Sequence, residues 1–389
     1  MEHPREITLL DYLADLTDPR HARGQRYAWL VILVVLCVAL VCGQQTVWGT
    51  AHWAFLRAPT IIAALGLTLR RLPSVSTFYR GLRQVSIAEL EDRIAAYGQA
   101  VDAQDPQSGC IRGLQGEILR GQAVDGQTLR GASAAGKLVH LLSLVRHGSG
   151  VTLGQARVDH KTNEITVVPQ LLVGRDLTGT VTTKDALLSQ RAIDQQILDQ
   201  HGDYLTIVKK NQGDLWTAID LLFQTPPLPG APTRPVYSYV GKEHGRLERR
   251  TLESSTELND YVQWPGVQQV LRRTCRRTHL KAGQVVKVEA EVTYGLTSLS
   301  PERVNLQHVE FFWRGHWTIE NRDHYVRDVT LGEDQCRMHM GSAAQALAAL
   351  RNGVLTALRH QGWENIAAAL RHYGSSVHKA LALIGVDST

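Results

Sequence analysis

Two acidic residues occupy positions where carboxylates can do chemistry on a phosphate. Asp125 ends the short apolar run 121–124 and is followed by Gly126, whereas Asp185 comes directly after the strand-like run 179–184. Both are expected at strand ends, where α/β sheets place their ligands. Carboxylate oxygens are the ligands that Mg²⁺ prefers, and waters and substrate phosphates fill its remaining positions.

A third acid, Glu320, lies in a segment whose spacing predicts a helix over 308–327. At helical spacing, one face gathers aromatic, cationic and acidic side chains, namely Trp313, His316, Trp317, Glu320, His324 and Arg327. The two tryptophans are more typical of a core than of a base-stacking platform. Three carboxylates held together would bind two divalent ions roughly 3.5–4 Å apart, which can activate a water or a 3′-hydroxyl for in-line displacement at a phosphodiester.

Position alone does not make these acids diagnostic, because a chain with 37 acidic residues places several at strand ends by chance. A zinc face made by His316, Glu320 and His324 is an alternative. It is disfavoured because no partnered ligand occurs elsewhere in the sequence, and because it leaves Asp125 and Asp185 unexplained.

Six short strings follow one another along the chain: VDGQTLRG (124–131), KTNEI (161–165), DALLSQ (185–190), VKKNQ (208–212), HGRLERR (244–250) and RGHWTIEN (314–321). Together they resemble the DDE transposases of bacterial insertion sequences, in the H-repeat-associated (ISAs-type) branch. The resemblance spans about residues 11–358. It implies that Asp125, Asp185 and Glu320 are the catalytic, metal-binding carboxylates, that two Mg²⁺ ions are the cofactor, with Mn²⁺ able to substitute, and that no covalent protein intermediate forms.

The resemblance also indicates DNA contacts. Related transposases carry a tyrosine, an arginine, a glutamate and a lysine on the last helix, where this chain has Trp313, His316, Glu320 and Arg327. His316 and Arg327 are therefore predicted to contact phosphates. A clamp at His316 is weaker than one on arginine, because histidine is charged only part of the time near neutral pH.

Further phosphate-contact candidates lie beside the matched strings, and surface ion pairs explain each of them equally well: Arg130, Lys209, Lys210 and Arg246. Lys210 stands where the branch usually has glycine. Asn211 is a candidate for contacting a base edge or for capping a turn. Glu164 lies in a matched string but stays outside the predicted metal set, since it can equally brace a hairpin.

The order of the elements predicts an α/β protein. Residues 1–115 have a helical pattern and form a DNA-binding or associated domain, and strand-like runs begin at Gly116. The resemblance implies an RNase H-like catalytic core, a mixed sheet flanked by helices. Its first part is expected over 116–225 and its second part, with C-terminal helices, over 308–389. A basic, β-rich insertion is expected between them, over 226–307.

Charge and composition limit the partners and the location. The net charge of +5 and the pI near 9.0 permit a polyanionic partner. Residues 234–281 contain 10 basic and 5 acidic residues, so their net charge of +5 equals that of the whole chain. Five scattered cysteines indicate a reducing, cytoplasmic location. The uncharged run 28–42 is shorter than the roughly 18–20 residues of a membrane span, so it predicts a buried helix and no membrane partner.

These observations lead to one expected function and two alternatives. The expected function is a DNA transposase that nicks and joins double-stranded DNA at the element's terminal inverted repeats and at the target, as a homodimer in the synaptic complex. The first alternative is a catalytically silent DNA-binding regulator or remnant of such an enzyme. The second is a structure-specific nuclease that cuts without joining.

Overall fold

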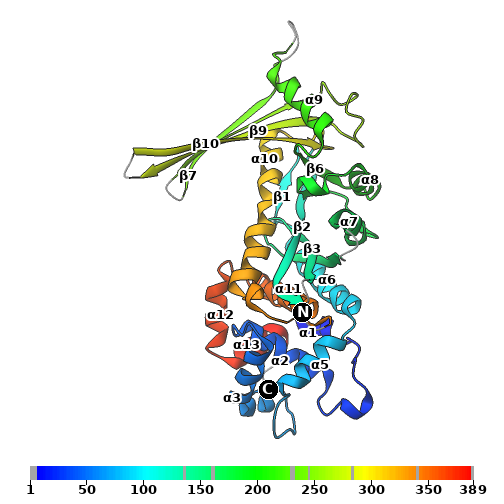
Figure 1. Ribbon diagram of the computed structural model, residues 1–389, viewed down its shortest axis with the longest axis vertical. Coiled ribbons are helices and arrows are strands. Elements are labelled where there is room, and N and C mark those ends of the chain that lie inside the picture. Colours follow the sequence, from blue (N-terminus) through cyan, green and yellow to red (C-terminus); the bar gives the residue numbers. More distant parts are fainter. Residues whose placement is uncertain are drawn as a thin grey trace. The chain divides into compact units, whose positions relative to one another are not determined.

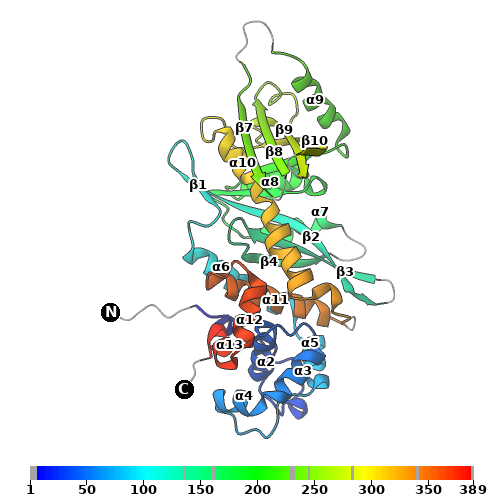
Figure 2. The ribbon, with the colours of Figure 1, turned by 90° about the vertical axis from the view of Figure 1, so that its left-hand side faces the viewer.

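The computed structural model describes residues 7–134, 137–158, 163–227, 233–243, 246–281, 284–338 and 341–386. Packing divides the chain into two units, each assembled from separate segments (Figures 1 and 2). Unit 1 comprises Met1–Ser108, Asp125–Val167 and Thr318–Thr389, and unit 2 comprises Gly109–Val124 and Val168–Trp317. The four segments predicted from the sequence do not coincide with these units, so that division remains a prediction.

Helices from both ends of the chain build most of unit 1. They are α1 (Leu9–Leu13), α2 (Trp29–Val41), α3 (Val47–Leu56), α4 (Ala58–Ala64), α5 (Val75–Gln84), α6 (Ile87–Gln104), α11 (Ala343–His360), α12 (Ile366–Gly374) and α13 (Val377–Ile384). The apolar run predicted to be a buried helix is α2, in which every residue except Leu30 is buried. No helix in the described residues is long and apolar enough to cross a membrane.

The alanine-rich helix α11 lies in the core of unit 1. Its residues 343–358 are all buried, and it contacts α2, α5 and α6.

A small residue on α6 allows that helix to pack closely against a neighbouring strand. Gly98 on α6 approaches the backbone of Thr152 so closely that a Cβ atom there would lie 2.0 Å from the Thr152 carbonyl oxygen. A glycine is therefore required where α6 meets the following strand layer.

One mixed sheet runs in the order β4-β3-β2-β5-β6-β10-β9-β8-β7, with β1 (Cys110–Arg112) paired to β2. Its first five strands are β2 (Ile118–Ala134), β3 (Lys137–Arg146), β4 (Thr152–Val158), β5 (Thr180–Lys184) and β6 (Asp203–Val208). β5 is parallel to β2 and to β6, whereas β4 is antiparallel to β3. With helices α7 (Glu164–Leu172) and α8 (Arg191–Asp199) following strands, this is the predicted RNase H-like α/β fold.

The predicted β-rich insertion consists of β7 (Val236–Glu243), β8 (Arg246–Ser255), β9 (Gln269–Lys281) and β10 (Gln284–Thr297). These strands are antiparallel, and β10 pairs with β6. The insertion therefore continues the sheet of unit 2. Helix α9 (Gly213–Gln224) precedes it and contacts β9 and β10 (Figure 1).

Helix α10 (Leu306–Gly315) packs against the sheet of unit 2. Its residues Val309, Phe312 and Trp313 join a buried cluster with leucines and valines from the strands, among them Leu119, Val181, Leu205, Leu252 and Leu271. These strand residues belong to β2, β5, β6, β8 and β9. The cluster therefore ties the parallel strands and the insertion strands to a single helix.

The helix predicted over 308–327 is not a uniform α-helix. After α10, the chain continues in π-helical turns over Ile319–His324 (η3) and Val326–Thr330 (η4). A π-helix bonds residue i to i+5, so it shifts every later side chain relative to α-helical spacing. The side chains beyond residue 318 therefore do not continue the face predicted from α-helical periodicity.

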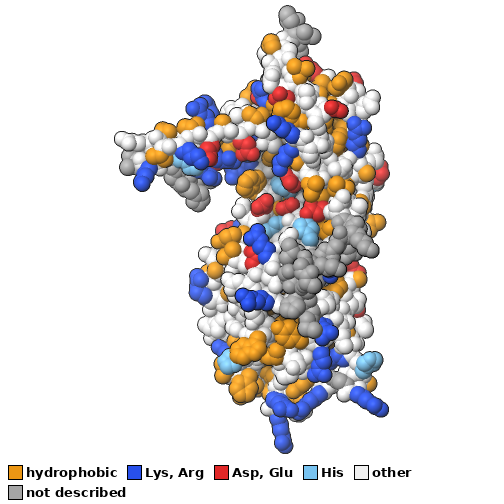
Figure 3. Space-filling view, viewed as in Figure 1, with side chains coloured by type: hydrophobic (Ala, Val, Ile, Leu, Met, Phe, Trp, Pro, Cys, Tyr) orange, Lys and Arg blue, Asp and Glu red, His pale blue; other side chains and the backbone are white. Residues whose placement is uncertain are grey.

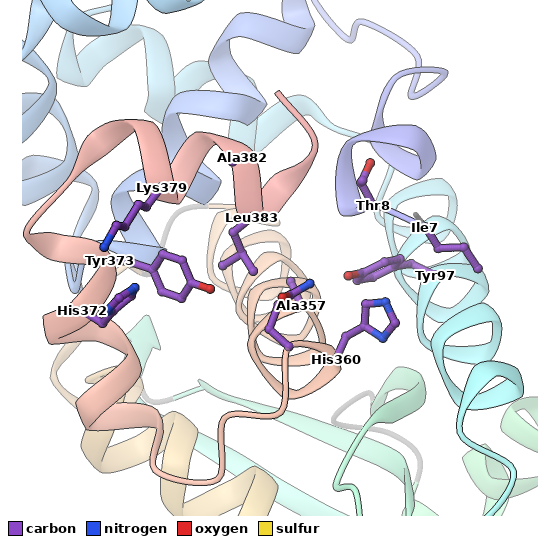
Figure 4. Close-up of a pocket in the computed structure, with 11 residues that line it drawn as sticks. Ile7, Thr8, Tyr97, Ala357, His360, His372, Tyr373, Lys379, Ala382 and Leu383 are labelled. Atoms are coloured by element: carbon purple, nitrogen blue, oxygen red, sulfur yellow. The ribbon is translucent and has the colours of Figure 1, made fainter. Parts of the chain in front are cut away.

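Unit 1 also encloses a pocket of about 310 Å³ (Figure 4). Its polar lining comes from α6, α11, α12 and α13 and includes Tyr97, His360, His372, Tyr373 and Lys379. Tyr97 is buried and stacks at a tilt against Tyr12, with ring centroids 5.5 Å apart. This pocket lies within the helical layer and contains none of the predicted site residues.

Candidate active site

The register of two parallel strands relates the two predicted catalytic aspartates. Val124 of β2 is the partner of Lys184 of β5, and Asp125 and Asp185 are the next residues of their strands' chains. Asp185 follows the end of β5, but Asp125 lies inside β2, which continues to Ala134, so the prediction that Asp125 stands at a strand end is wrong. Both residues nevertheless come directly after the last pair at the C-terminal end of the parallel pairing. This is the end of parallel strands at which α/β proteins bind ligands.

A network of unit 2 holds Asp185 in its ionised form. The Lys209 ammonium lies 3.0 Å from Oδ1 of Asp185. Burial alone raises the pKa of Asp185, but the backbone N–H of Ala186 and the charge of Lys209 outweigh it and lower this pKa below its usual value. The carboxylate is about half exposed, so it is charged and remains accessible to solvent.

The turn after Asp185 is fixed by side chains that bond its backbone. Asn211 donates its amide to the carbonyl of Ala186 at 3.1 Å, and Ser189 donates its hydroxyl to the carbonyl of Ile207 at 2.7 Å. Before the turn, Lys184 is wholly buried and pairs with Asp194 and Thr206. Burial lowers the pKa of Lys184, and the nearby Asp194 carboxylate opposes that change. The strand end is thus anchored on both sides of Asp185.

Two neighbours of Asp125 lie in unit 1. The backbone N–H of Gly126 donates to its Oδ1 at 2.8 Å, and Nδ1 of His324 lies 3.7 Å from its Oδ2. His324 is mostly buried, and burial lowers its pKa, so the neutral imidazole is favoured. A neutral imidazole beside a carboxylate can serve as a hydrogen-bond partner or as an additional ligand donor.

A second pair of polar side chains lies next to Gly126. Nε2 of His140 is 2.5 Å from Oε1 of Glu164, and Nδ1 of His140 is 2.8 Å from the hydroxyl of Thr128. A Cβ atom on Gly126 would lie 2.3 Å from the same Glu164 oxygen. Glycine at 126 is therefore what lets this pair approach the chain directly after Asp125.

Glu320 lies on η3 and has an exposed side chain. Within the described part of the chain, its carboxylate forms no hydrogen bond and no ion pair. The π-helical turn that carries it is of a kind often found at functional sites. Glu320 and Asp125 belong to unit 1, and Asp185 belongs to unit 2.

The predicted phosphate contacts fall into two groups, of which the first is accessible. The Arg130 side chain is 79% exposed, and its guanidinium is 3.8 Å from Asp334. Lys210 is exposed and lies over the Trp216 ring, 5.4 Å from its centroid. Arg246 is partly exposed beside Glu248. Together with Lys209 and Asn211, these residues remain predicted DNA contacts.

The second group is engaged within the protein. Nδ1 of His316 lies 3.1 Å from the hydroxyl of Thr183, the residue two positions before Asp185. Arg327 requires a correction, because its side chain has no exposed surface and forms ion pairs with Asp323 and Glu333. A buried guanidinium cannot reach a phosphate. The prediction came from the position of Arg327 in the motif of related transposases, and that position alone does not show whether the side chain is buried.

Sequence reasoning missed the pairing of His140 with Glu164 beside Gly126 and the place of His324 beside Asp125. His140 is 24 residues from Glu164 and His324 is 199 residues beyond Asp125, so no local spacing links either pair. Glu164 stood in a matched string and was open to two interpretations. Its contact with His140 connects the strand layer to the start of α7.

The donor chemistry of the site suits a hard cation, since Asp125, Asp185 and Glu320 all present carboxylate oxygens that are at least partly exposed. Among the residues that the structure describes, no group of three or more His, Cys, Asp or Glu side chains is arranged to hold a metal ion. A shared metal site made by the three acids therefore stays a prediction.

Comparisons with known proteins agree with these features. Residues 118–357 match the family model described as "Transposase DDE domain", and residues 10–97 match the one described as "DDE_Tnp_1-associated". The Escherichia coli K12 protein "H repeat-associated putative transposase YhhI" is 32% identical over 354 residues, which cover 88% of each chain. The Escherichia coli O157:H7 protein "Putative transposase YncI" is 31% identical over 375 residues, covering 90% of this chain and 87% of that one.

Among solved structures, a piggyBac transposase synaptic complex with hairpin DNA matches with a TM-score of 0.40 and 10% identity, over 97% of this chain and 77% of that chain.

Proposed function

The chain belongs to the DDE transposase family, in its H-repeat-associated branch, and on that premise we propose that it cuts DNA at the ends of an insertion sequence and joins those ends to target DNA. The observation that carries the proposal is the register of β2 and β5, in which Val124 faces Lys184 directly before the two aspartates. The C-terminal end of a parallel strand pairing is where α/β sheets bind their ligands.

In this proposal Asp125, Asp185 and Glu320 supply the carboxylates that hold two Mg²⁺ ions, for which Mn²⁺ can substitute. Transposases of this family generally use divalent metal ions. When bound, the ions neutralise charge on the phosphate and supply an activated water or 3′-hydroxyl. The lowered pKa of Asp185 keeps one ligand ionised at neutral pH without help from a metal.

The other residues of the site position the carboxylates and the DNA. The hydrogen bond from Gly126 orients Asp125, and the bond from Asn211 to Ala186 fixes the turn behind Asp185. Lys209 is both the partner of Asp185 and an exposed cation, so it is suited to contact a phosphate next to the reacting one. The accessible Arg130 and Lys210 extend this cationic surface along a DNA backbone.

The family indicates DNA as the partner, and we propose that the chain acts on DNA as a homodimer. Two element ends must be cut and joined in one event, which two copies of the chain accomplish when each holds one end. The exposed basic residues of each copy then contact the backbone of terminal and target DNA.

The test is Glu320→Gln in the full-length chain, which keeps the side-chain shape and removes the charge that a metal needs. Cleavage of a plasmid carrying the element's terminal repeats is measured with Mg²⁺, and DNA binding is measured with Ca²⁺. Cleavage should fall about a thousandfold or more, because metal ions supply several kcal/mol of transition-state stabilisation. Binding should be retained.

Glu302→Gln is the matched control, since Glu302 is an exposed glutamate in a turn of unit 2 and should tolerate the change. Normal cutting by Glu320→Gln would reject Glu320 as the third ligand. Binding without any Mg²⁺-dependent cutting by the unaltered chain would favour the silent regulator, and cutting without joining would favour the nuclease.

A further inference from the structure

Residues 1–115 carry 11 arginines, no lysine and 10 acidic residues, so their net charge is only +1. They nevertheless include a long segment without acids. Residues 19–88 contain eight arginines and no aspartate or glutamate, whereas acids occur before residue 19 and again from Glu89. In the structure this segment forms α2 to α5, and six of its arginines are exposed: Arg23, Arg26, Arg70, Arg71, Arg80 and Arg83. In the described part of the chain, Arg20 alone among the eight has a carboxylate partner, Asp18.

A pocket of about 440 Å³ opens on this acid-free segment. Its lining includes Trp48, His52 and Phe55 of α3. Arg70 and Arg71, which precede α5, line it as well. In Figure 3, hydrophobic side chains gather over the helices in the lower part of the view, and Lys and Arg side chains lie beside them. The volume falls within the range of about 300–1,000 Å³ that is typical of small-molecule sites.

Two large aromatic side chains that line this pocket are mostly exposed to solvent. Trp48 is 64% exposed and Phe55 is 74% exposed, although both rings belong to a helix whose inner face is well packed. Trp48 stacks on His52, with ring centroids 5.6 Å apart and planes 15° apart, so its ring is held in a fixed orientation. Exposed apolar surface of this kind, rimmed by charge, marks a binding site.

We infer that this pocket, bounded by Trp48, Phe55, Arg70 and Arg71 and called here the Trp48 pocket, binds an unstacked nucleobase of DNA together with its flanking phosphates. The inference rests on the proposed function only in taking DNA as the partner. Aromatic rings stack on the faces of unpaired bases, and arginines contact the backbone on either side. The pocket supplies both groups within one concave surface.

Two other occupants fit less well. A second copy of the chain, meeting this one by two-fold symmetry, would place the same acid-free surface opposite itself, so exposed arginines would face arginines. An intact duplex would satisfy Arg70 and Arg71 with phosphates but would keep its base faces stacked. Trp48 and Phe55 would then have no partner, which favours an unpaired base.

The experiment uses the full-length chain without divalent metal, so that binding is separated from cleavage. Fluorescence anisotropy measures the Kd for a short labelled oligothymidylate and for the matching thymine-adenine duplex. Trp48→Ala and Phe55→Ala should each weaken single-strand binding by about tenfold and leave duplex binding nearly unchanged. Trp48→Phe should restore most of the single-strand affinity, because it keeps an aromatic face.

The arginines give a second, independent readout. Replacing Arg70 and Arg71 together by alanine should weaken binding of both probes and reduce the dependence of log K on log salt by about one for each arginine. Tyr261→Ala is the control for the aromatic variants, since Tyr261 is 72% exposed and lies in unit 2 outside this segment. Arg371→Ala, an exposed arginine on α12, is the control for charge.

The outcomes separate this inference from the proposed function. The inference is overturned if Trp48→Ala binds oligothymidylate like Tyr261→Ala, or if it weakens both probes equally, even when the chain cuts element ends with Mg²⁺. It is also overturned if the unaltered chain binds neither DNA probe but self-associates through Trp48. A chain that neither binds nor cuts DNA would overturn both proposals. Thermal unfolding of each variant verifies that its fold is intact.

Discussion

The ionisation of Asp328 on η4 is strongly disturbed by its surroundings. Burial and the neighbouring Asp334 and Glu333 carboxylates raise its pKa to about 6, although Gln127 donates a hydrogen bond to it. In an unfolded chain this pKa returns to about 4. Between these values the folded protein binds more protons than the unfolded chain, so stability falls as the pH rises through about 6.

Asp328→Asn should therefore raise the melting temperature at about pH 8, where the native carboxylate is charged next to other acids, and the gain should disappear near pH 4. Thermal unfolding followed across this pH range measures the effect. Asp176→Asn is the control of opposite sign, because hydrogen bonds from Thr178 lower the pKa of Asp176. An equal gain in both variants would mean that Asp328 is not the source.

Single residues were predictable where the chain itself fixes their position. The apolar runs before Asp125 and Asp185 are paired strands in the structure, although β2 continues beyond Asp125. Arg327 was assigned to a phosphate contact from its place in the family motif, but its side chain is wholly buried. His140 and Glu164 could not be paired from sequence, since their contact depends on how β3 lies against the start of α7.

At the scale of elements, α10 is fastened to the insertion strands by one buried acid. Oε1 of Glu310 accepts from Arg250 of β8 at 3.0 Å, and its two oxygens accept from Arg273 of β9 at 2.8 and 2.9 Å. Glu310 and Arg250 are buried, and Arg273 lies over the Trp313 ring. One carboxylate thus balances two guanidinium groups between a helix and a sheet.

Glu310→Gln should lower the free energy of unfolding by about 3 kcal/mol, because it leaves two largely buried guanidinium groups without a counter-charge. Denaturant unfolding of the full chain measures the loss. Glu291→Gln is the matched control on the same face of the sheet. Glu291 is 61% exposed and pairs with Arg277 at 3.3 Å, so its loss should be below about 1 kcal/mol. Similar losses in both variants would contradict this account of Glu310.

Elements were predictable in type and less so in their connections. The buried helix α2, the alanine-rich helix α11 and the β-rich insertion all follow from apolar runs, composition and alternation. The pairing of β10 with β6 was not predictable, because it joins residues more than eighty positions apart through a register that only packing sets. The π-helical turns likewise have no local signal in the sequence.

At the scale of the whole molecule, the N-terminal helices share unit 1 with segments from later in the chain. Gln345 of α11 and Gln155 of β4 both donate to Oε1 of Glu91 on α6, at 2.8 and 2.7 Å. The buried Asp102 of α6 pairs with Arg146 of β3 at 2.8 Å. Unit 1 therefore closes its core with segments that follow residue 124, and cutting the chain after residue 108 removes those partners.

A fragment of residues 1–108 should accordingly lack a cooperative thermal transition, because the apolar α2 and the acids Glu91 and Asp102 lose the surfaces and the polar groups that surround them. Circular dichroism on heating measures this, beside binding of a hydrophobic dye. Mixing the fragment with residues 109–389 should restore a cooperative transition, since unit 1 can then be completed. A sharp transition of the fragment alone, near the melting temperature of the full chain, would show that its helices fold independently and that the later segments only decorate them.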